Sequence, residues 1–393
     1  MKANHAKQII FLRAILLGIG ISVGTMVHAA TYTYTWQAVD GNWDGNISDA
    51  AHWTCDTADR PGAPETTSDK LSIKIPAGVQ ARITIDKDLS VGSFFSESGS
   101  HVTLVSVDKA DTGELTHLQL SSGLFIREGA TLVLDHAKIT NTGDNFTVSN
   151  QGKGKAMNGS LLTNKNFHLR NTSGKSTFEV SGKSIVSFSN FYIGGGNRFV
   201  INDSTVSVGK LLLCTDSNTL TSEVTSLCFM GNNPQMLFDD GPSENGRRTQ
   251  ACVANSKSDG DVLNFDFIVP EDGFNSTPIT IVGTDRAIYL FADPLDGNTA
   301  NKGKFRFNVS DESPLVLNQR KIEQKLVEWR LNSDQNKSEE GFNFSNIITG
   351  KLPGKARQAE FNSGIISTSA NQITFAYSVL LDCRPTGFKV IVR

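Results

Sequence analysis

The sequence predicts an all-β protein, most of it a parallel β-solenoid, with an N-terminal cap and a smaller C-terminal β domain of sandwich type. Three observations lead to this fold class. Short alternating apolar segments run from about Leu71 to Phe238, a repeat of about 20 residues lies within them, and the composition changes after Asp240. No stripe of helical period is sustained for three turns in the alternating region.

The alternating segments have the residue types of half-buried strands. Apolar and polar side chains take turns, and Val, Ile and Phe are frequent, which favours strands with one buried face. Gly, Asn, Ser and Asp between the segments supply the turns. Examples of such segments are LSIKI, ARITI, HVTLV, TLVLD, TFEV and RFVI.

A repeat predicts how these strands are arranged. Phe178 and Val180 recur 21 residues later as Phe199 and Ile201. Four further apolar positions recur 20 residues later, pairing Val186 with Val206, Phe188 with Val208, Phe191 with Leu211, and Ile193 with Leu213. A unit this short, with three apolar pairs, cannot bury its own inner face, so we expect copies to stack as coils of three short strands. The alternative is an antiparallel sandwich in which the similarity is accidental.

The segment DGNWDGNISDAAHW, residues 40–53, allows two interpretations. As an EF-hand calcium loop, it would take its ligands from Asp40, Asn42, Asp44, Asn46 and Ser48. The twelfth loop position, which needs a bidentate Glu, is Ala51. We therefore favour a turn anchored by Trp36, Trp43 and Trp53, and we predict neither a metal ion nor a cofactor.

The same segment resembles the N-terminal unit of exported bacterial β-helix proteins of the autotransporter passenger-like kind. That unit reads roughly W, GxW, AANW, a Pro/Gly loop and IPAG before the first coil. The matching pieces are Trp36, GNW at 41–43, AAHW at 50–53, RPGAP at 60–64 and IPAG at 75–78. His52 stands where the family usually has Asn. The resemblance covers about residues 32–240 and implies export and a right-handed parallel β-helix, but no reaction.

The chain divides into five predicted parts. Residues 1–29 predict a signal peptide, because a basic start and a short apolar stretch precede Val27-His28-Ala29, which fits a signal peptidase site. Residues 30–70 are the expected cap and 71–240 the solenoid. Residues 241–261, rich in Gly, Ser and Asn, predict a linker or long loop. Residues 262–393 predict the C-terminal β domain, in which KIEQKLVEWRL is favoured as a strand over a helix.

Composition limits the partners. The chain carries a net charge of −3, and the first 29 residues hold three basic residues and no acid, so the exported part is more negative still. This charge disfavours nucleic acid or an anionic bilayer as the main partner. No segment after the signal has the roughly 18 apolar residues of a membrane helix. The five cysteines allow one or two disulfides after export, with Cys214–Cys228 the favoured pair and buried free thiols the alternative.

Few residues fit a catalytic role. Polysaccharide lyases and hydrolases need clustered acids or two opposed carboxyl groups. The candidates are Asp239 and Asp240, which are more simply a solvated turn, and the scattered Asp135, Glu179 and Asp203. The histidines have no zinc-site spacing. We predict no catalytic, cofactor-binding or metal-binding residue.

The predicted function is therefore non-catalytic. We expect an exported structural or adhesin-like protein at the cell surface or outside the cell, with the periplasm as the alternative compartment. Its expected partner is a glycan or another surface component, because the flanks of a solenoid present ladders of polar side chains. The alternative function is that of a polysaccharide lyase or glycoside hydrolase of the parallel β-helix type.

Overall fold

The computed structural model describes residues 31–58, 60–169, 175–214, 225–238, 250–255, 262–270, 272–283, 289–290, 304–311, 321–331, 347–349, 358–369 and 372–382. The chain divides into two units, Met1–Thr31 and Tyr32–Arg393, and the strands of the described residues lie in the second. The predicted signal peptide, residues 1–29, lies outside the described residues, as do Asp239 and Asp240.

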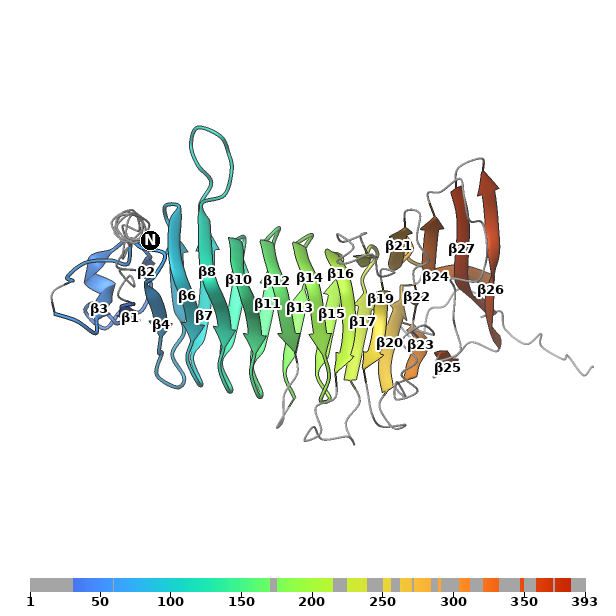
Figure 1. Ribbon diagram of the computed structural model, residues 1–393, viewed down its shortest axis with the longest axis horizontal. Helices are drawn as coiled ribbons and strands as arrows, with labels where there is room; N and C mark the ends of the chain where they lie inside the picture. The colour runs from blue at the N-terminus through green and yellow to red at the C-terminus, as the bar shows by residue number, and fades with distance from the viewer. Residues whose placement is uncertain are drawn as a thin grey trace, which may run out of the picture. The chain divides into compact units, whose positions relative to one another are not determined.

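The described strands of the second unit form two sheets (Figure 1). The sheet that we call the long sheet holds, in spatial order, β3 (Trp53–Cys55), β1 (Thr33–Trp36), β4 (Lys70–Ile73), β6 (Leu89–Ser96), β8 (His117–Ile126), β10 (Lys138–Val148), β12 (Leu161–Leu169), β14 (Ile185–Ile193), β16 (Thr205–Cys214), β18 (Gln235–Phe238), β21 (Ile279–Gly283), β24 (Lys321–Leu331), β27 (Gln372–Asp382) and β26 (Gln358–Ser369). Two further strands lie off this path: β19 (Gln250–Asn255) pairs with β16, and β22 (Tyr289–Leu290) pairs with β19.

The second sheet runs beside the long sheet. It holds, in spatial order, β2 (Gly45–Asn46), β5 (Ala81–Ile85), β7 (His101–Ser106), β9 (Thr131–Asp135), β11 (Lys153–Met157), β13 (Thr177–Val180), β15 (Arg198–Asn202), β17 (Thr225–Met230), β20 (Val262–Val269), β23 (Lys304–Asp311) and β25 (Ile347–Thr349). From β4 to β18 the chain alternates between the two sheets, and every pairing among these strands is parallel. The prediction of an all-β chain with long parallel sheets is confirmed, and this arrangement is consistent with a β-solenoid.

The predicted repeat is reproduced residue by residue. Phe178 pairs with Phe199 between β13 and β15, and Val180 pairs with Ile201. Between β14 and β16 the in-register pairs are Val186 with Val206, Phe188 with Val208, Phe191 with Leu211, and Ile193 with Leu213. All of these side chains are buried. One detail differs from the prediction, because the second and third expected strands of each coil form a single long strand, such as β14.

Buried amides stabilise the bend within these long strands. The register of β10 with its neighbours shifts between Asn141 and Asn145. Asn141 donates to the Asn145 carbonyl at 2.9 Å and to the side-chain oxygen of Asn164, which in turn donates to the Asn166 carbonyl at 2.6 Å. Asn141 and Asn164 are both buried. Their side chains thus bond to backbone carbonyls where the pairing of the strands is irregular.

A row of buried serines fixes the turns from the second sheet back to the long sheet. The Ala137 N–H donates to Ser160 Oγ at 3.0 Å, the Ser160 N–H to Ser184 Oγ at 3.1 Å, and the Ser184 N–H to Ser204 Oγ at 3.2 Å. All three serines are buried. Each hydroxyl therefore accepts from the equivalent turn of the preceding coil, which aligns successive coils.

Stacked phenylalanines fill the middle of the core. The ring of Phe167 lies at the centre of this cluster, with ring centroids between 4.6 and 5.8 Å from those of Phe146, Phe178, Phe188, Phe191 and Phe199. Gly154 leaves room for one of these rings, because a Cβ at that position would lie 2.3 Å from the Phe178 ring.

The tryptophans anchor the segment at 36–53, as the sequence predicts. Trp36 is buried, stacks on His52 with ring centroids 4.4 Å apart, and donates from Nε1 to the Trp43 carbonyl at 2.9 Å. Trp53 is buried as well and donates to the Ile47 carbonyl at 2.9 Å. His52 closes the short 3-10 helix η1 (Ala50–His52).

The oxygens of the EF-hand-like segment have other partners. Asp44 Oδ1 accepts from the Arg82 N–H at 2.6 Å, and Ser48 donates to the carboxylate of Asp86. Asn42 Oδ1 accepts from the Asp44 N–H at 3.1 Å. These contacts tie the segment to β5 and the residue that follows it.

The ladders continue beyond the boundary that the sequence predicts at residue 240. Cys252 of β19, inside the expected linker, pairs with Leu211. In the second sheet, Leu227 pairs in parallel with Phe265, and Phe265 with Phe307. Successive coils there are separated by about forty residues instead of twenty, so the repeat is hidden in the sequence although the pairing is unchanged. The described strands of 262–393 thus extend the two sheets instead of forming a sandwich of their own.

The end of the long sheet does become antiparallel. β24, which is a strand as the sequence favours, pairs in parallel with β21 and antiparallel with β27. β27 then pairs antiparallel with β26.

Candidate functional site

The outer face of the long sheet carries a row of half-buried side chains at one register position. The in-register partners on five adjacent strands are Phe95, Phe125, Thr147, His168 and Tyr192. We call these residues the aromatic row. Each lies between two buried residues in its strand, and alternation therefore directs it away from the core.

The rings of the row form two stacked pairs. The centroids of Phe95 and Phe125 are 4.7 Å apart with an interplanar angle of 9°, and those of His168 and Tyr192 are 4.5 Å apart at 1°. These separations match the spacing of about 4.8 Å between neighbouring strands. Thr147 separates the two pairs, so the row spans roughly 19 Å across five strands.

Arg127 extends the first pair. Its guanidinium carbon lies 4.9 Å from the Phe95 ring centroid and 5.7 Å from that of Phe125. A cation in this position is attracted by the negative faces of the rings. The Arg127 side chain itself is exposed.

A row of amides runs beside the rings. Two residues before Thr147, His168 and Tyr192 lie, in register, the residues Asn145, Asn166 and Asn190. We call these three residues the amide row. Asn190 Nδ2 donates to Asn166 Oδ1 at 2.8 Å. Since each amide has two donors and one acceptor oxygen, a single bond of this kind leaves further hydrogen-bonding capacity at the surface.

Gly123 positions the ring of Phe125. It occupies the register position of the amide row on β8, and a Cβ there would lie 2.5 Å from Phe125 Cε2. The glycine therefore leaves room for the Phe125 ring above its own strand. Together the two rows place stacked aromatic rings beside hydrogen-bonding groups.

The sequence reasoning missed the aromatic row. A signal for it exists, because each row residue is the middle of a triplet whose outer members are buried. Examples are Leu124-Phe125-Ile126 and Phe191-Tyr192-Ile193. In a strand the middle residue of such a triplet must point outward, so an aromatic residue there lies on the outer face of the sheet.

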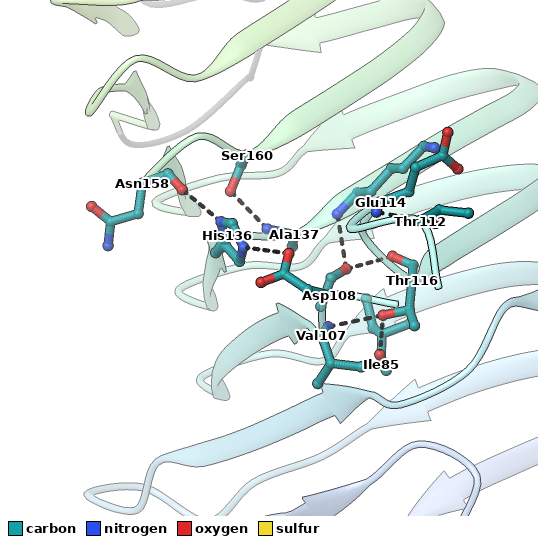
Figure 2. A network of polar contacts seen from close by, with 12 residues as sticks. Ile85, Val107, Asp108, Thr112, Glu114, Thr116, His136, Ala137, Asn158 and Ser160 are labelled. Carbon is teal, nitrogen blue, oxygen red and sulfur yellow. Dashed lines mark hydrogen bonds and ion pairs between the residues drawn. The ribbon is translucent and has the colours of Figure 1, made fainter. Parts of the chain in front are cut away.

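A separate polar cluster fixes the loop between β7 and β8, at the other end of β8 (Figure 2). The hydroxyl of Thr116 accepts from the Val107 N–H at 2.9 Å and donates to the Ile85 carbonyl. Asp108 Oδ1 lies 3.4 Å from His136 Nε2. These contacts hold the base of the loop against the neighbouring coils.

His117, the first residue of β8, is sensitive to pH. Burial, followed by the charge of Lys138, lowers the pKa of its imidazole. Its Nε2 is buried and has no hydrogen-bond partner among the described residues. Protonation of this imidazole would therefore destabilise the folded protein.

We expect this group to make stability fall with acidification. The unfolded chain binds the His117 proton more readily, so the loss begins below the unfolded pKa of about 6.5 and continues down to the lower folded pKa. The melting temperature of the wild type should therefore fall more steeply than that of His117→Gln as the pH is lowered below about 6.5. Equal slopes in thermal scans over this range would contradict the assignment.

The structure does not bring the predicted catalytic candidates together. Asp135 accepts from Asn158 Nδ2 at 2.7 Å, Glu179 pairs with Lys155 at 3.1 Å, and Asp203 accepts from the Asn233 N–H at 2.7 Å. These partners are different for each acid. Asp239 and Asp240 lie outside the described residues. Within the described part of the chain, no group of three or more His, Cys, Asp or Glu residues could hold a metal ion.

The favoured disulfide is not formed. Cys228 is a buried free thiol in β17 of the second sheet, whereas Cys214 belongs to β16 of the long sheet. Arg198 Nη2 lies 3.4 Å from the Cys228 sulfur, and burial raises the pKa of the thiol. Cys55 is free as well.

Comparisons with protein-family models, with curated proteins and with solved structures found no match to this chain. Among the described residues, no helix has the length and apolar character that crossing a membrane requires.

Proposed function

We propose that this protein is an exported, non-catalytic β-solenoid that binds a glycan through the aromatic and amide rows of its long sheet. The observation that carries the proposal is the in-register row of stacked rings beside a row of amides. The protein would act at the cell surface or outside the cell as a structural or adhesive component.

The chemistry of the two rows suits a sugar chain. One face of a pyranose ring presents apolar C–H groups, which pack against aromatic rings. The hydroxyl groups at the ring edge can donate to and accept from side-chain amides such as those of Asn166 and Asn190. Because the platform repeats from strand to strand, it favours a polymer over a single sugar, each unit adding a weak contact.

The placement outside the cell rests on the sequence. The predicted signal peptide and the resemblance of residues 32–240 to exported bacterial β-helix proteins support export. The resemblance also supports a right-handed coil and a capping role for the tryptophan segment. An end cap is physically needed, because an open edge strand recruits other chains. The buried Trp36 and Trp53 and the short strand β3 fit this role.

The alternative, a polysaccharide-active enzyme, rests on Asp239 and Asp240. Incubation of the mature protein with acidic and neutral glycans would release unsaturated products from a lyase or new reducing ends from a hydrolase. Turnover that Asp239→Asn or Asp240→Asn abolishes would replace the non-catalytic proposal with this one.

The glycan proposal is tested by removing one ring. We expect Tyr192→Ala to weaken binding to a polysaccharide ligand about 3- to 10-fold, because a stacking contact contributes about 0.5–1.5 kcal/mol. The measurement is a glycan array followed by affinity electrophoresis on the polymers that bind.

The matched control is Ile185→Ala. Ile185 is 51% exposed and lies on the same strand as Tyr192, outside the aromatic row. Its replacement should leave affinity within about twofold. Equal losses in both variants, or no binding to any glycan on the array, would refute the proposed site.

A further inference from the structure

We infer that the glycan bound by the aromatic row is acidic, with Arg127 as the residue that binds the carboxylate of a uronic acid. The inference rests on the proposed function, since it names the class of ligand for the same site. It starts from the position of Arg127, whose guanidinium lies over both Phe95 and Phe125.

The contact with the rings leaves the N–H donors of the guanidinium for a ligand. The rings attract its positive charge and are not conventional acceptors for its five N–H groups. These donors have the fork geometry that binds a carboxylate through two parallel hydrogen bonds. A sugar that lies on the aromatic row next to Arg127 would therefore have a carboxylate-binding group at its border.

The carboxylates beside Arg127 do not occupy this fork. Ile126 and Ser96 are in-register partners, so the ladder places Glu97 next to Arg127. Glu97 instead accepts from the Ser72 hydroxyl at 2.9 Å. The ion pairs of the described residues include none between Arg127 and either Glu97 or Glu128.

Other cations near the two rows are less suited to this role. Lys165 lies on β12 but pairs with Asp144 at 2.8 Å. Lys210 continues the register of the amide row on β16, at the far end from the Phe95–Phe125 pair. Arg127 is thus the described cation that combines an aromatic platform with an exposed, unneutralised fork.

The test compares acidic polymers with their uncharged counterparts. The probes are polygalacturonate, alginate and hyaluronate, each beside its carboxyl-reduced form, in which the chain is kept and the charge is removed. We expect at least one acidic polymer to bind about tenfold more tightly than its reduced form, and we expect Arg127→Gln to abolish that preference. Binding of the reduced form should change by less than about twofold in this variant.

The control is Lys153→Gln, which removes the same charge from an exposed position on the second sheet. It should keep the preference for the acidic polymer, and retention in Lys153→Gln together with loss in Arg127→Gln excludes a general effect of net charge. Equal binding of acidic and reduced forms in all three pairs, with Tyr192→Ala still weakening both, would overturn this inference and leave the glycan site intact. If no polymer binds, neutral or acidic, the proposed function itself fails.

Discussion

Replacing Phe167 by alanine is expected to lower the free energy of unfolding by about 3–5 kcal/mol. The Phe167 ring is fully buried and has five other phenylalanine rings around it, from both sheets and from neighbouring coils. Because the rings interdigitate, the neighbours cannot collapse fully into the space, and a cavity remains. Urea unfolding followed by circular dichroism measures the change.

The control for Phe167→Ala lies on the same strand. Leu161 is 36% exposed on β12, and Leu161→Ala should change stability by no more than about 0.5 kcal/mol. A loss below about 1 kcal/mol in Phe167→Ala would mean that the phenylalanine cluster does not form the centre of the core.

The second large effect is expected at Asp69. Its side chain is fully buried, and one carboxylate oxygen accepts from the N–H groups of Glu65 and Thr66 at 2.9 and 2.8 Å, while the other lies 3.3 Å from Arg60 Nη1. Asp69→Ala leaves both N–H donors without this acceptor. We expect a loss of about 2–3 kcal/mol, since hydrogen bonds to a charged group contribute about 1.5–3 kcal/mol.

An exposed acid provides the comparison for Asp69. Asp144 forms an ion pair with Lys165, but both side chains are more than half exposed, and such pairs contribute about 0–1 kcal/mol. Asp144→Ala should therefore be close to neutral in the same unfolding experiment. Similar losses in Asp69→Ala and Asp144→Ala would show that burial of the carboxylate is not what makes Asp69 important.

The stacking of successive coils in the middle of the chain could be predicted from the sequence, because the coils there have nearly the same length. Phe178 and Phe199 are 21 residues apart, and this constant offset places like residues in register. Beyond residue 240 the same pairing joins Phe265 to Phe307 across a much longer connection. Pairing depends on the alternation within each strand and not on the length of the loop between strands, so a search for a constant period ends too early.

The binding face was harder to predict than the core. Phe125 and Tyr192 each sit between two apolar residues, and in the sequence they resemble further core residues. Only the alternation of the strand assigns them to the outer face, and only the register places Phe95 beside Phe125 and His168 beside Tyr192. The tryptophan segment was easier, because its rings lie close together in the sequence and in the fold.

The most direct test of the account is disulfide mapping across two adjacent coils. Thr163 of β12 and Ser187 of β14 are in-register partners, so their Cα atoms should be about 4.8 Å apart, within the range that a disulfide bridges. The variant with Thr163→Cys and Ser187→Cys should cross-link under mild oxidation. The variant with Thr163→Cys and Ile185→Cys, displaced by two residues to about 8 Å, should not. The cross-link is located by peptide mapping with mass spectrometry. The predicted result is a link in the first variant only. A link mainly in the second variant, or no link in either variant, would contradict the stacked register on which the binding face depends.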